Sequence, residues 1–274
     1  MLEENIRSCA SNDIAAYQLD GVICLRQCFS ADAVEELRAA VEGSLATPAK
    51  FGGSIETNDG KGRFENRFRL REEHPTYEQY SMRGPLPALA SQLLDTSRVN
   101  LFFDQYLVKE PGTSQPTAWH NDQPYWPIKG RKIVSFWIAL DHVDETNGRV
   151  EFVRGSHRLG KMFQPQSFGK REKYARNEAL ERVPDINANR DKYDIVSWNL
   201  EPGDAIVFDG LITHGAGGNL SSGQRRRAYI IRYTGDDIVY EPRIGTSPEL
   251  LYDDLVEGRP ITSEHYPEVW ARPK

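Results

Sequence analysis

The spacing of hydrophobic residues changes part of the way along the chain. In the N-terminal part, Val34, Leu37, Val41 and Leu45 recur at helical spacing and predict a helix with one buried face, for which Ser30 is the expected N-cap. The same kind of pattern predicts helices over residues 12–20 and 86–94 and a short strand over residues 22–25. We therefore expect this part of the chain to be largely helical.

Residues 48–71 interrupt this pattern with glycine, asparagine and charged side chains, including Gly52-Gly53 and Gly60-Lys61-Gly62. Glycine favours turns and irregular backbone because it tolerates positive φ angles. The apolar pattern resumes directly afterwards, so we predict a mobile loop or lid here rather than a linker between domains.

From Leu101 onward the apolar residues form short runs rich in Val, Ile, Phe, Tyr and Trp, which are typical of β-strands. These runs cover residues 101–109, 133–140, 149–153, 195–198, 205–208 and 228–233. Asn147-Gly148 is the strongest hairpin signal, because a type I′ turn needs positive φ at both central residues. The polar stretch 161–194 is expected to be an insertion with some helix. Short strands joined by tight turns predict a barrel or sandwich rather than repeated βαβ units.

Composition places the chain among ordinary globular proteins. Its 274 residues are 39% hydrophobic, which is enough to bury the core of one domain. A net charge of −6 without a long basic tract argues against nucleic-acid binding, and no apolar run reaches the roughly 18 residues of a membrane span. Three cysteines without a disulfide or zinc pattern, and an N-terminus without a signal-peptide pattern, favour the cytoplasm. Homodimerisation stays open.

We expect a single domain over residues 1–274. It would consist of a helical N-terminal part over residues 1–98, a β core over about residues 99–240 and a C-terminal extension over residues 241–274. The predicted fold class is therefore mainly β with flanking helices.

Two histidines and one aspartate are the candidate metal ligands. His120 and Asp122 are two residues apart, so on an extended strand both side chains point to the same face. His214 follows much later and can come from another strand of the same barrel. Two imidazoles and one carboxylate form the facial triad that holds non-haem Fe(II) and leaves coordination positions open. The other histidines are interpreted as surface or structural residues; they are His74, His142, His157 and His265.

A His-X-Asp pair alone arises often by chance, so a second feature is needed. Arg225-Arg226-Arg227 follows His214 and leads directly into an apolar strand. Oxygenases with this triad use a co-substrate such as 2-oxoglutarate, which chelates the metal and presents a second carboxylate. Arginine suits that carboxylate because it binds bidentately and stays charged. The alternative is a solvated charged turn, but the strand that follows favours at least one inward-pointing arginine.

Residues 101–237 resemble the phytanoyl-CoA dioxygenase family of Fe(II)- and 2-oxoglutarate-dependent oxygenases. The resemblance lies in the segments Trp119–Trp126, Phe136–Asp141, Asn147–His157, Pro202–Ala205, His214–Asn219, Arg225–Ala228 and Gly235–Asp237. It implies a double-stranded β-helix (jelly-roll, cupin-like) core. It also implies that His120, Asp122 and His214 bind iron and act in catalysis.

The same resemblance implies the co-substrate contacts. Counting forward from His214 assigns the far carboxylate of 2-oxoglutarate to Arg225, whereas alignment through Ala228 assigns it to Arg226, which we choose. Further residues expected to contact the co-substrate are Trp137, Gln105 and Asn121. Relatives that halogenate carry a small residue at the position of Asp122, so a carboxylate there favours hydroxylation or a related oxidation.

The expected protein is an oxidoreductase, a dioxygenase that uses Fe(II), 2-oxoglutarate and O₂, with ascorbate as a candidate reductant. Its partner would be a small-molecule substrate, first of all an intermediate of secondary-metabolite biosynthesis. Candidate substrate contacts are Tyr125, Trp126, Arg63 and Arg67. The alternatives are an acyl-CoA hydroxylase of the same family, a jelly-roll metalloprotein that does not use 2-oxoglutarate, and a non-catalytic binding protein.

Overall fold

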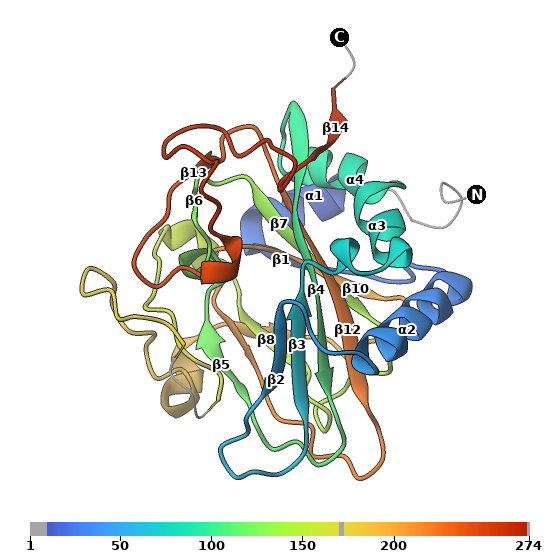
Figure 1. Cartoon of the computed structure of the whole chain (residues 1–274). Coiled ribbons are helices and arrows are strands. Elements are labelled where there is room, and N and C mark those ends of the chain that lie inside the picture. The colour runs from blue at the N-terminus through green and yellow to red at the C-terminus, as the bar shows by residue number, and fades with distance from the viewer. Residues whose placement is uncertain (1–9, 170–172, 273–274) are drawn as a thin grey trace.

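Two antiparallel β-sheets packed face to face form the body of the protein (Figure 1). The computed structural model describes residues 10–169 and 173–272. The large sheet contains the strands β1 (Val22–Leu25), β10 (Ala205–Asp209), β7 (Ile133–Ala139), β12 (Arg226–Thr234), β4 (Arg98–Lys109), β3 (Phe64–Phe68) and β2 (Gly52–Ile55), in that order, with β14 (Glu268–Ala271) pairing to β4. The small sheet runs β5 (Thr117–His120), β11 (His214–Ala216), β8 (Val150–Val153) and β9 (Ile195–Ser197). A short ribbon joins β6 (Ile128–Lys129) to β13 (Val239–Tyr240).

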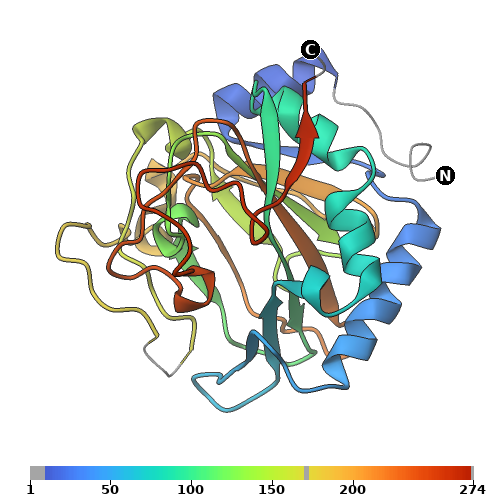
Figure 2. The same cartoon turned by 45° about the horizontal axis from the view of Figure 1, so that its top comes forward.

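The four α-helices of the described residues cover the outer face of the large sheet (Figure 2). They are α1 (Ser11–Asp20), α2 (Ala31–Leu45), α3 (Pro75–Met82) and α4 (Leu86–Leu93). Along β7, Phe136 and Ile138 face the helices while Trp137 faces the small sheet, as the two-residue period of a strand requires. The core between the sheets includes Trp137, Ile230 and Phe152. The predicted mainly β fold with flanking helices, a jelly-roll core, is confirmed.

Helix α2 follows the predicted pattern. Val34, Leu37 and Val41 are buried, and the Ser30 hydroxyl accepts a hydrogen bond from the backbone N–H of Ala33. This N-cap satisfies a donor that the first turn of a helix leaves without an intrahelical partner. Among the residues described, no helix combines the length and apolar character that a membrane span requires.

The prediction of a mobile loop over residues 48–71 was wrong. Strands β2 and β3 form a hairpin there, and β3 pairs with β4 at the edge of the large sheet. The polar composition of this segment suggested exposed residues, but Glu65 and Arg67 are buried beneath the helical layer. There they form an ion pair at 4.0 Å. Gly52 has φ +82, and a Cβ atom there would lie 2.1 Å from the Asn66 carbonyl oxygen, so glycine is required by this close approach.

The hairpin predicted at Asn147-Gly148 was also wrong. The strands on either side, β7 and β8, lie in different sheets, and of these two residues only Gly148 has a positive φ. Asn147 instead fixes a wider turn: its amide donates to the His142 carbonyl and accepts from the Asp144 N–H. In the stretch 161–194, the helical element among the described residues is a 3₁₀ helix over Asn187–Lys192.

A carboxylate at the end of β12 allows a test of fold stability. Asp236 accepts hydrogen bonds from the Ser97 N–H at 2.9 Å and from the Lys132 ammonium at 2.8 Å. Burial alone would raise the pKa of Asp236, but Lys132 and Ser97 outweigh it and hold that pKa below its usual value. A carboxylate with a lowered folded-state pKa stabilises the fold above its unfolded-state pKa, and this contribution is lost as the pH falls.

We therefore expect Asp236→Asn to lower the free energy of unfolding by about 1 kcal/mol at pH 7. The difference from the wild type should shrink as the pH falls through about 4, where the unfolded carboxyl is half protonated, and toward the lower folded-state pKa. Urea unfolding of both proteins at several pH values measures this. A difference that is the same at every pH would contradict the assignment.

Candidate metal centre and co-substrate pocket

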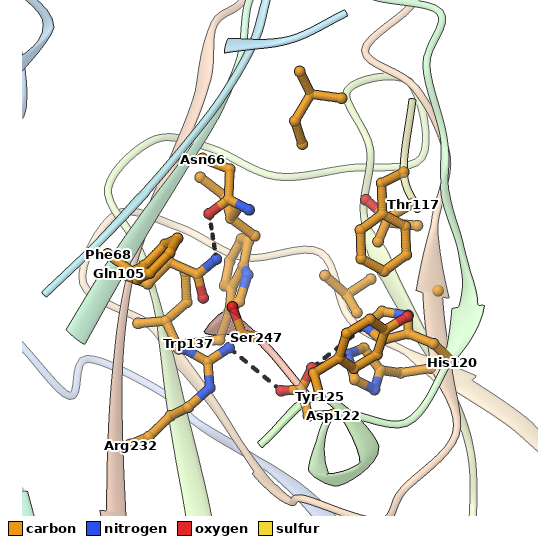
Figure 3. A pocket seen from close by; sticks show the side chains of 18 of the residues that line it. Asn66, Phe68, Gln105, Thr117, His120, Asp122, Tyr125, Trp137, Arg232 and Ser247 are labelled. Atoms are coloured by element: carbon orange, nitrogen blue, oxygen red, sulfur yellow. Dashed lines mark hydrogen bonds and ion pairs between the residues drawn. The ribbon is translucent and has the colours of Figure 1, made fainter. Parts of the chain in front are cut away.

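His120, Asp122 and His214 come together on the small sheet. His120 ends β5, His214 begins β11, and the two are paired directly across the antiparallel ladder. Asp122 lies just beyond β5 at the start of a 3₁₀ turn. This turn, and not the alternation of side chains along an extended strand, brings its carboxylate to the imidazoles. One ligand atom from each of the three residues lies within 4.8 Å of the others. All three are buried and line one cavity, and Figure 3 shows His120 and Asp122 pointing into it.

Backbone carbonyl groups set the tautomers of both histidines. Nδ1 of His120 lies 2.7 Å from the Ala118 oxygen, and Nδ1 of His214 lies 3.1 Å from the Ile212 oxygen. A carbonyl oxygen only accepts hydrogen bonds, so each Nδ1 carries the proton and donates it. The Nε2 lone pairs are thereby free and point toward Asp122 Oδ1, at 3.4 Å from His120 and 3.9 Å from His214. This is the tautomer that a metal ligand needs.

The protonation states also suit a cation. Burial, together with the neighbouring His120, lowers the pKa of His214 to about 4, so its imidazole is neutral at pH 7. Burial would raise the pKa of Asp122, but the positive charge of the Arg232 guanidinium outweighs it and holds that pKa well below its usual range. The site therefore offers at least one neutral imidazole and a carboxylate that is ionised at neutral pH.

A cavity between the two sheets opens beside these three residues. Its wall on the large sheet includes Asn66, Phe68, Gln105, Trp137 and Arg232 (Figure 3). The opposite wall carries the metal-ligand candidates with Thr117 and Tyr125 (Figure 3). The cavity continues into a second hollow, which residues 52–63, 167–169 and 173–174 border. The lining residues common to both are Ile55, Asn66, Phe68, Phe168, Lys173 and Tyr174.

Of the three consecutive arginines, only Arg226 lines this cavity. It is 1% exposed, and its Nε and Nη1 have no hydrogen-bond acceptor among the residues that the structure describes. Its guanidinium lies 5.5 Å from the ring centre of Trp137. Burial lowers the pKa of Arg226 to about 10, which keeps it charged at pH 7. A buried, charged guanidinium whose donors lack acceptors is well suited to bind a carboxylate group of a ligand, which would accept these hydrogen bonds.

The neighbouring arginines point away from the cavity. Arg225 pairs with Glu42 at 2.6 Å and with Glu110 at 2.8 Å near the surface. Arg227 binds both oxygens of Asp141, at 2.9 and 2.7 Å. The structure therefore places Arg226, and not the alternative Arg225, in the position expected for a co-substrate contact.

Of the other predicted co-substrate contacts, two line the cavity and one does not. Trp137 and Gln105 line the cavity, and the Gln105 amide donates to Asn66 Oδ1. Asn121 does not line it. Its amide donates to the Lys161 carbonyl at 2.8 Å and accepts from the Phe163 N–H at 3.2 Å. The expectation for Asn121 is corrected accordingly: the side chain turns away from the triad and holds the segment that follows β8.

Of the predicted substrate contacts, the two aromatic residues line the cavity and the two arginines do not. Tyr125 and Trp126 line the cavity. Arg67 does not, because it projects from the opposite face of β3, is 4% exposed and donates a hydrogen bond to the Ser44 carbonyl. Arg63 lies outside the cavity, where its Nε contacts Glu65 at 2.6 Å, although it borders the second hollow. The expectation for Arg67 is therefore corrected, whereas a substrate contact for Arg63 stays a prediction that involves the second hollow.

Several cavity residues were missed from the sequence. Phe168, Lys173 and Tyr174 come from the irregular stretch after β8, whose composition carries no signal of burial. Arg232 could have been found: it stands six residues after Arg226 on β12, and an even spacing on a strand places both side chains on the same face.

Comparison with known proteins places the chain in context. Residues 17–228 match the family model described as Phytanoyl-CoA dioxygenase (PhyH), a stretch that contains the three metal-ligand candidates and Arg226. The peroxisomal phytanoyl-CoA dioxygenase of Rattus norvegicus is 28% identical over 153 residues, which are 54% of this chain and 43% of that protein. The chain thus spans less than half the length of this curated relative.

Two further relatives match over more of their length. The ectoine dioxygenase of Sphingopyxis alaskensis is 24% identical over 237 residues, which are 81% of this chain and 75% of that enzyme. The solved structure of the epimerase SnoN, in complex with Fe3+, alpha ketoglutarate and nogalamycin RO, superposes with a TM-score of 0.72 at 25% identity. That similarity covers 94% of this chain and 97% of SnoN.

Proposed function

Because the chain belongs to the phytanoyl-CoA dioxygenase family, we propose that it is a non-haem Fe(II)- and 2-oxoglutarate-dependent dioxygenase. Its reaction would be the oxidation, first of all the hydroxylation, of a C–H bond in a small organic molecule. One observation supports this most strongly: His120, Asp122 and His214 converge on one wall of a cavity into which the opposite sheet projects the buried Arg226.

The donor set fits Fe(II). His120 and His214 would each bind it through Nε2, and Asp122 through Oδ1, the oxygen nearer to both imidazoles. Three protein donors on one side of an octahedral ion leave positions for a chelating co-substrate and for O₂. The carboxylate of Asp122 occupies the position that a halide would need, which supports oxidation and not halogenation.

Arg226 fits the far carboxylate of 2-oxoglutarate, because its Nε and Nη1 lack acceptors among the described residues and burial strengthens a charge-assisted pair. Trp137 would hold the plane of this guanidinium from one side. Gln105 lines the same cavity and would add a polar contact. Bound Fe(II) and 2-oxoglutarate, with O₂, supply the oxidising chemistry and yield succinate and CO₂, while ascorbate would keep the iron reduced.

Aromatic side chains would position the substrate and limit the access of water. The Phe168 ring lies 4.8 Å and the Tyr125 ring 5.8 Å from the His120 ring, centre to centre. The Tyr125 hydroxyl is fixed by Gln166, whose N–H donates to it at 2.7 Å. Exclusion of water strengthens electrostatic interactions in the site and protects reactive species from side reactions. Tyr125 and Trp126 are therefore our candidates for substrate contact.

The substrate class is proposed from the relatives. SnoN, which matches over nearly the whole of both chains, is an epimerase from nogalamycin biosynthesis. This similarity supports an intermediate of secondary-metabolite biosynthesis as the substrate. An acyl-CoA ester is the second choice, because the rat phytanoyl-CoA dioxygenase matches only about half of this chain.

A turnover assay tests the proposal. Purified protein with Fe(II), ascorbate and 2-oxoglutarate in air is expected to release succinate slowly, and faster when pools of biosynthetic intermediates are added. A chelator should stop the reaction. Oxidation of an added compound that needs the metal but not 2-oxoglutarate would instead favour a different jelly-roll metalloenzyme. Failure to bind 2-oxoglutarate in the presence of metal would contradict the proposal outright.

A further inference from the structure

The cavity contains a second buried guanidinium, that of Arg232, next to the metal-ligand candidates. Arg232 lies on β12 and is 6% exposed. It shares a strand face with Arg226, but its position farther along the strand brings it to the end of the cavity where Asp122 lies (Figure 3). The two arginines therefore border different parts of the same cavity, and only Arg232 adjoins the proposed iron site.

Arg232 uses few of its hydrogen-bond donors. Its Nη2 donates to Asp122 Oδ2 at 3.3 Å, which is a long hydrogen bond for an ion pair. Within residues 10–169 and 173–272, its buried Nε and Nη1 have no acceptor. The guanidinium packs against two neighbouring rings, at 4.6 Å from the centre of Phe103 and 5.3 Å from that of Trp126. A guanidinium has five N–H donors, so an additional acceptor is needed to offset the cost of its burial.

The sum of charges in the cavity, once Fe(II) and 2-oxoglutarate are bound, indicates which kind of acceptor Arg232 needs. Among the described residues that line it, Asp122 is the only carboxylate, whereas two guanidiniums line it, those of Arg226 and Arg232. Lys173 also lines the cavity, but Glu249 neutralises it at 2.6 Å. Bound Fe(II) and the 2-oxoglutarate dianion would cancel each other, and Asp122 would cancel one guanidinium. One buried positive charge would then be left, and an isolated buried charge is costly.

We propose, on the basis of the function proposed above, that Arg232 binds a carboxylate group of the substrate, which is therefore an organic acid. One negative charge completes the balance, whereas a phosphate dianion would exceed it. Much of the remaining wall is apolar or aromatic and suits an apolar substrate body; this part includes Ile55, Phe68, Phe168, Tyr174 and Leu250. Because Arg232 adjoins Asp122, the oxidised C–H bond would lie near the carboxylate and not at the far end of the molecule.

Matched pairs of acids and neutral amides test this proposal without knowledge of the natural substrate. The protein is first loaded with Mn(II), which is inert to turnover, and saturated with 2-oxoglutarate, and both binding steps are measured by calorimetry. Octanoate, octanamide, 3-phenylpropanoate and 3-phenylpropanamide are then titrated into this complex. Each acid is expected to bind about 10- to 100-fold more tightly than its amide, as a buried charge-assisted pair implies.

Two substitutions of Arg232 and one control complete the experiment. Arg232→Met should remove the preference for acids, and Arg232→Lys should retain it at reduced affinity, since lysine keeps the charge but not the planar fork. The control, Arg154→Met, removes one positive charge from a half-exposed residue that pairs with Asp194, and it should bind the acids as the wild type does. Binding of Mn(II) and 2-oxoglutarate by each variant shows that it is folded.

The possible outcomes separate the two proposals. If the wild type fails to bind Mn(II) with 2-oxoglutarate, the proposed function fails and this inference fails with it. If the wild type binds both, only the inference is at stake. Equal binding of acid and amide would then overturn it, as would no saturable binding of either acid at millimolar concentration. Undiminished binding of the acids by Arg232→Met would overturn it too.

Discussion

His214→Ala is expected to lower 2-oxoglutarate turnover more than about 1000-fold, because the site loses one of three metal donors. The remaining pair, His120 and Asp122, would bind Fe(II) too weakly to keep it during turnover. The substitution removes the hydrogen bond from Nδ1 to the Ile212 carbonyl, worth about 1 kcal/mol, and the packing of the imidazole against Phe152 and Phe208. The metal-free variant should therefore still unfold cooperatively, at a lower temperature than the metal-free wild type, and differ from it in iron content.

A matched control is available in His142→Ala. His142 is partly exposed, lies outside the cavity and contacts Glu201 at 3.0 Å. This variant should keep its iron and its rate of succinate formation. Turnover by His214→Ala at a rate near that of the wild type would exclude this imidazole as a metal ligand.

Arg226→Met is expected to raise the apparent KM for 2-oxoglutarate about 100-fold, because it removes a buried, charge-assisted pair worth roughly 2–3 kcal/mol. The maximal rate at saturating co-substrate should fall much less, since the metal ligands are untouched. Iron binding in the absence of 2-oxoglutarate should be unchanged. Steady-state kinetics with varied 2-oxoglutarate, together with iron titration, measure these quantities separately.

The adjacent residue provides the control for this prediction. Arg225→Met removes the same charge one position earlier, but Arg225 pairs with Glu42 and Glu110 near the surface. Its KM for 2-oxoglutarate should stay within about twofold of the wild-type value, as is usual for exposed ion pairs. A large increase for Arg225→Met with none for Arg226→Met would show that the co-substrate lies elsewhere.

These two arginines also show what sequence patterns determine and what they leave open. Along a strand, a shift of one residue moves every side chain to the other face. The composition of Arg225-Arg226-Arg227 is compatible with either register, so the sequence left two candidates for the inward position. The pairing of Arg226 with Lys109 across β12 and β4 fixes the register in the structure.

The metal-ligand candidates could be predicted because His120 and Asp122 are two residues apart and the motifs around His214 carry the family resemblance. The features that were missed depend on contacts between distant segments. Strand β3 was not recognised because Glu65 and Arg67 look like surface residues until the helical layer is seen to cover them. Asn121 was misassigned because proximity in sequence to His120 does not fix the direction of a side chain that holds another loop.

A crystal grown without oxygen and soaked with Fe(II) and 2-oxoglutarate tests the central claim most directly. Anomalous scattering at the iron edge locates the metal independently of any assumption about its ligands. We expect one iron between Nε2 of His120, Nε2 of His214 and Oδ1 of Asp122, with 2-oxoglutarate reaching from that iron to the Arg226 guanidinium. Iron at another position, or 2-oxoglutarate bound without contact to Arg226, would contradict the account.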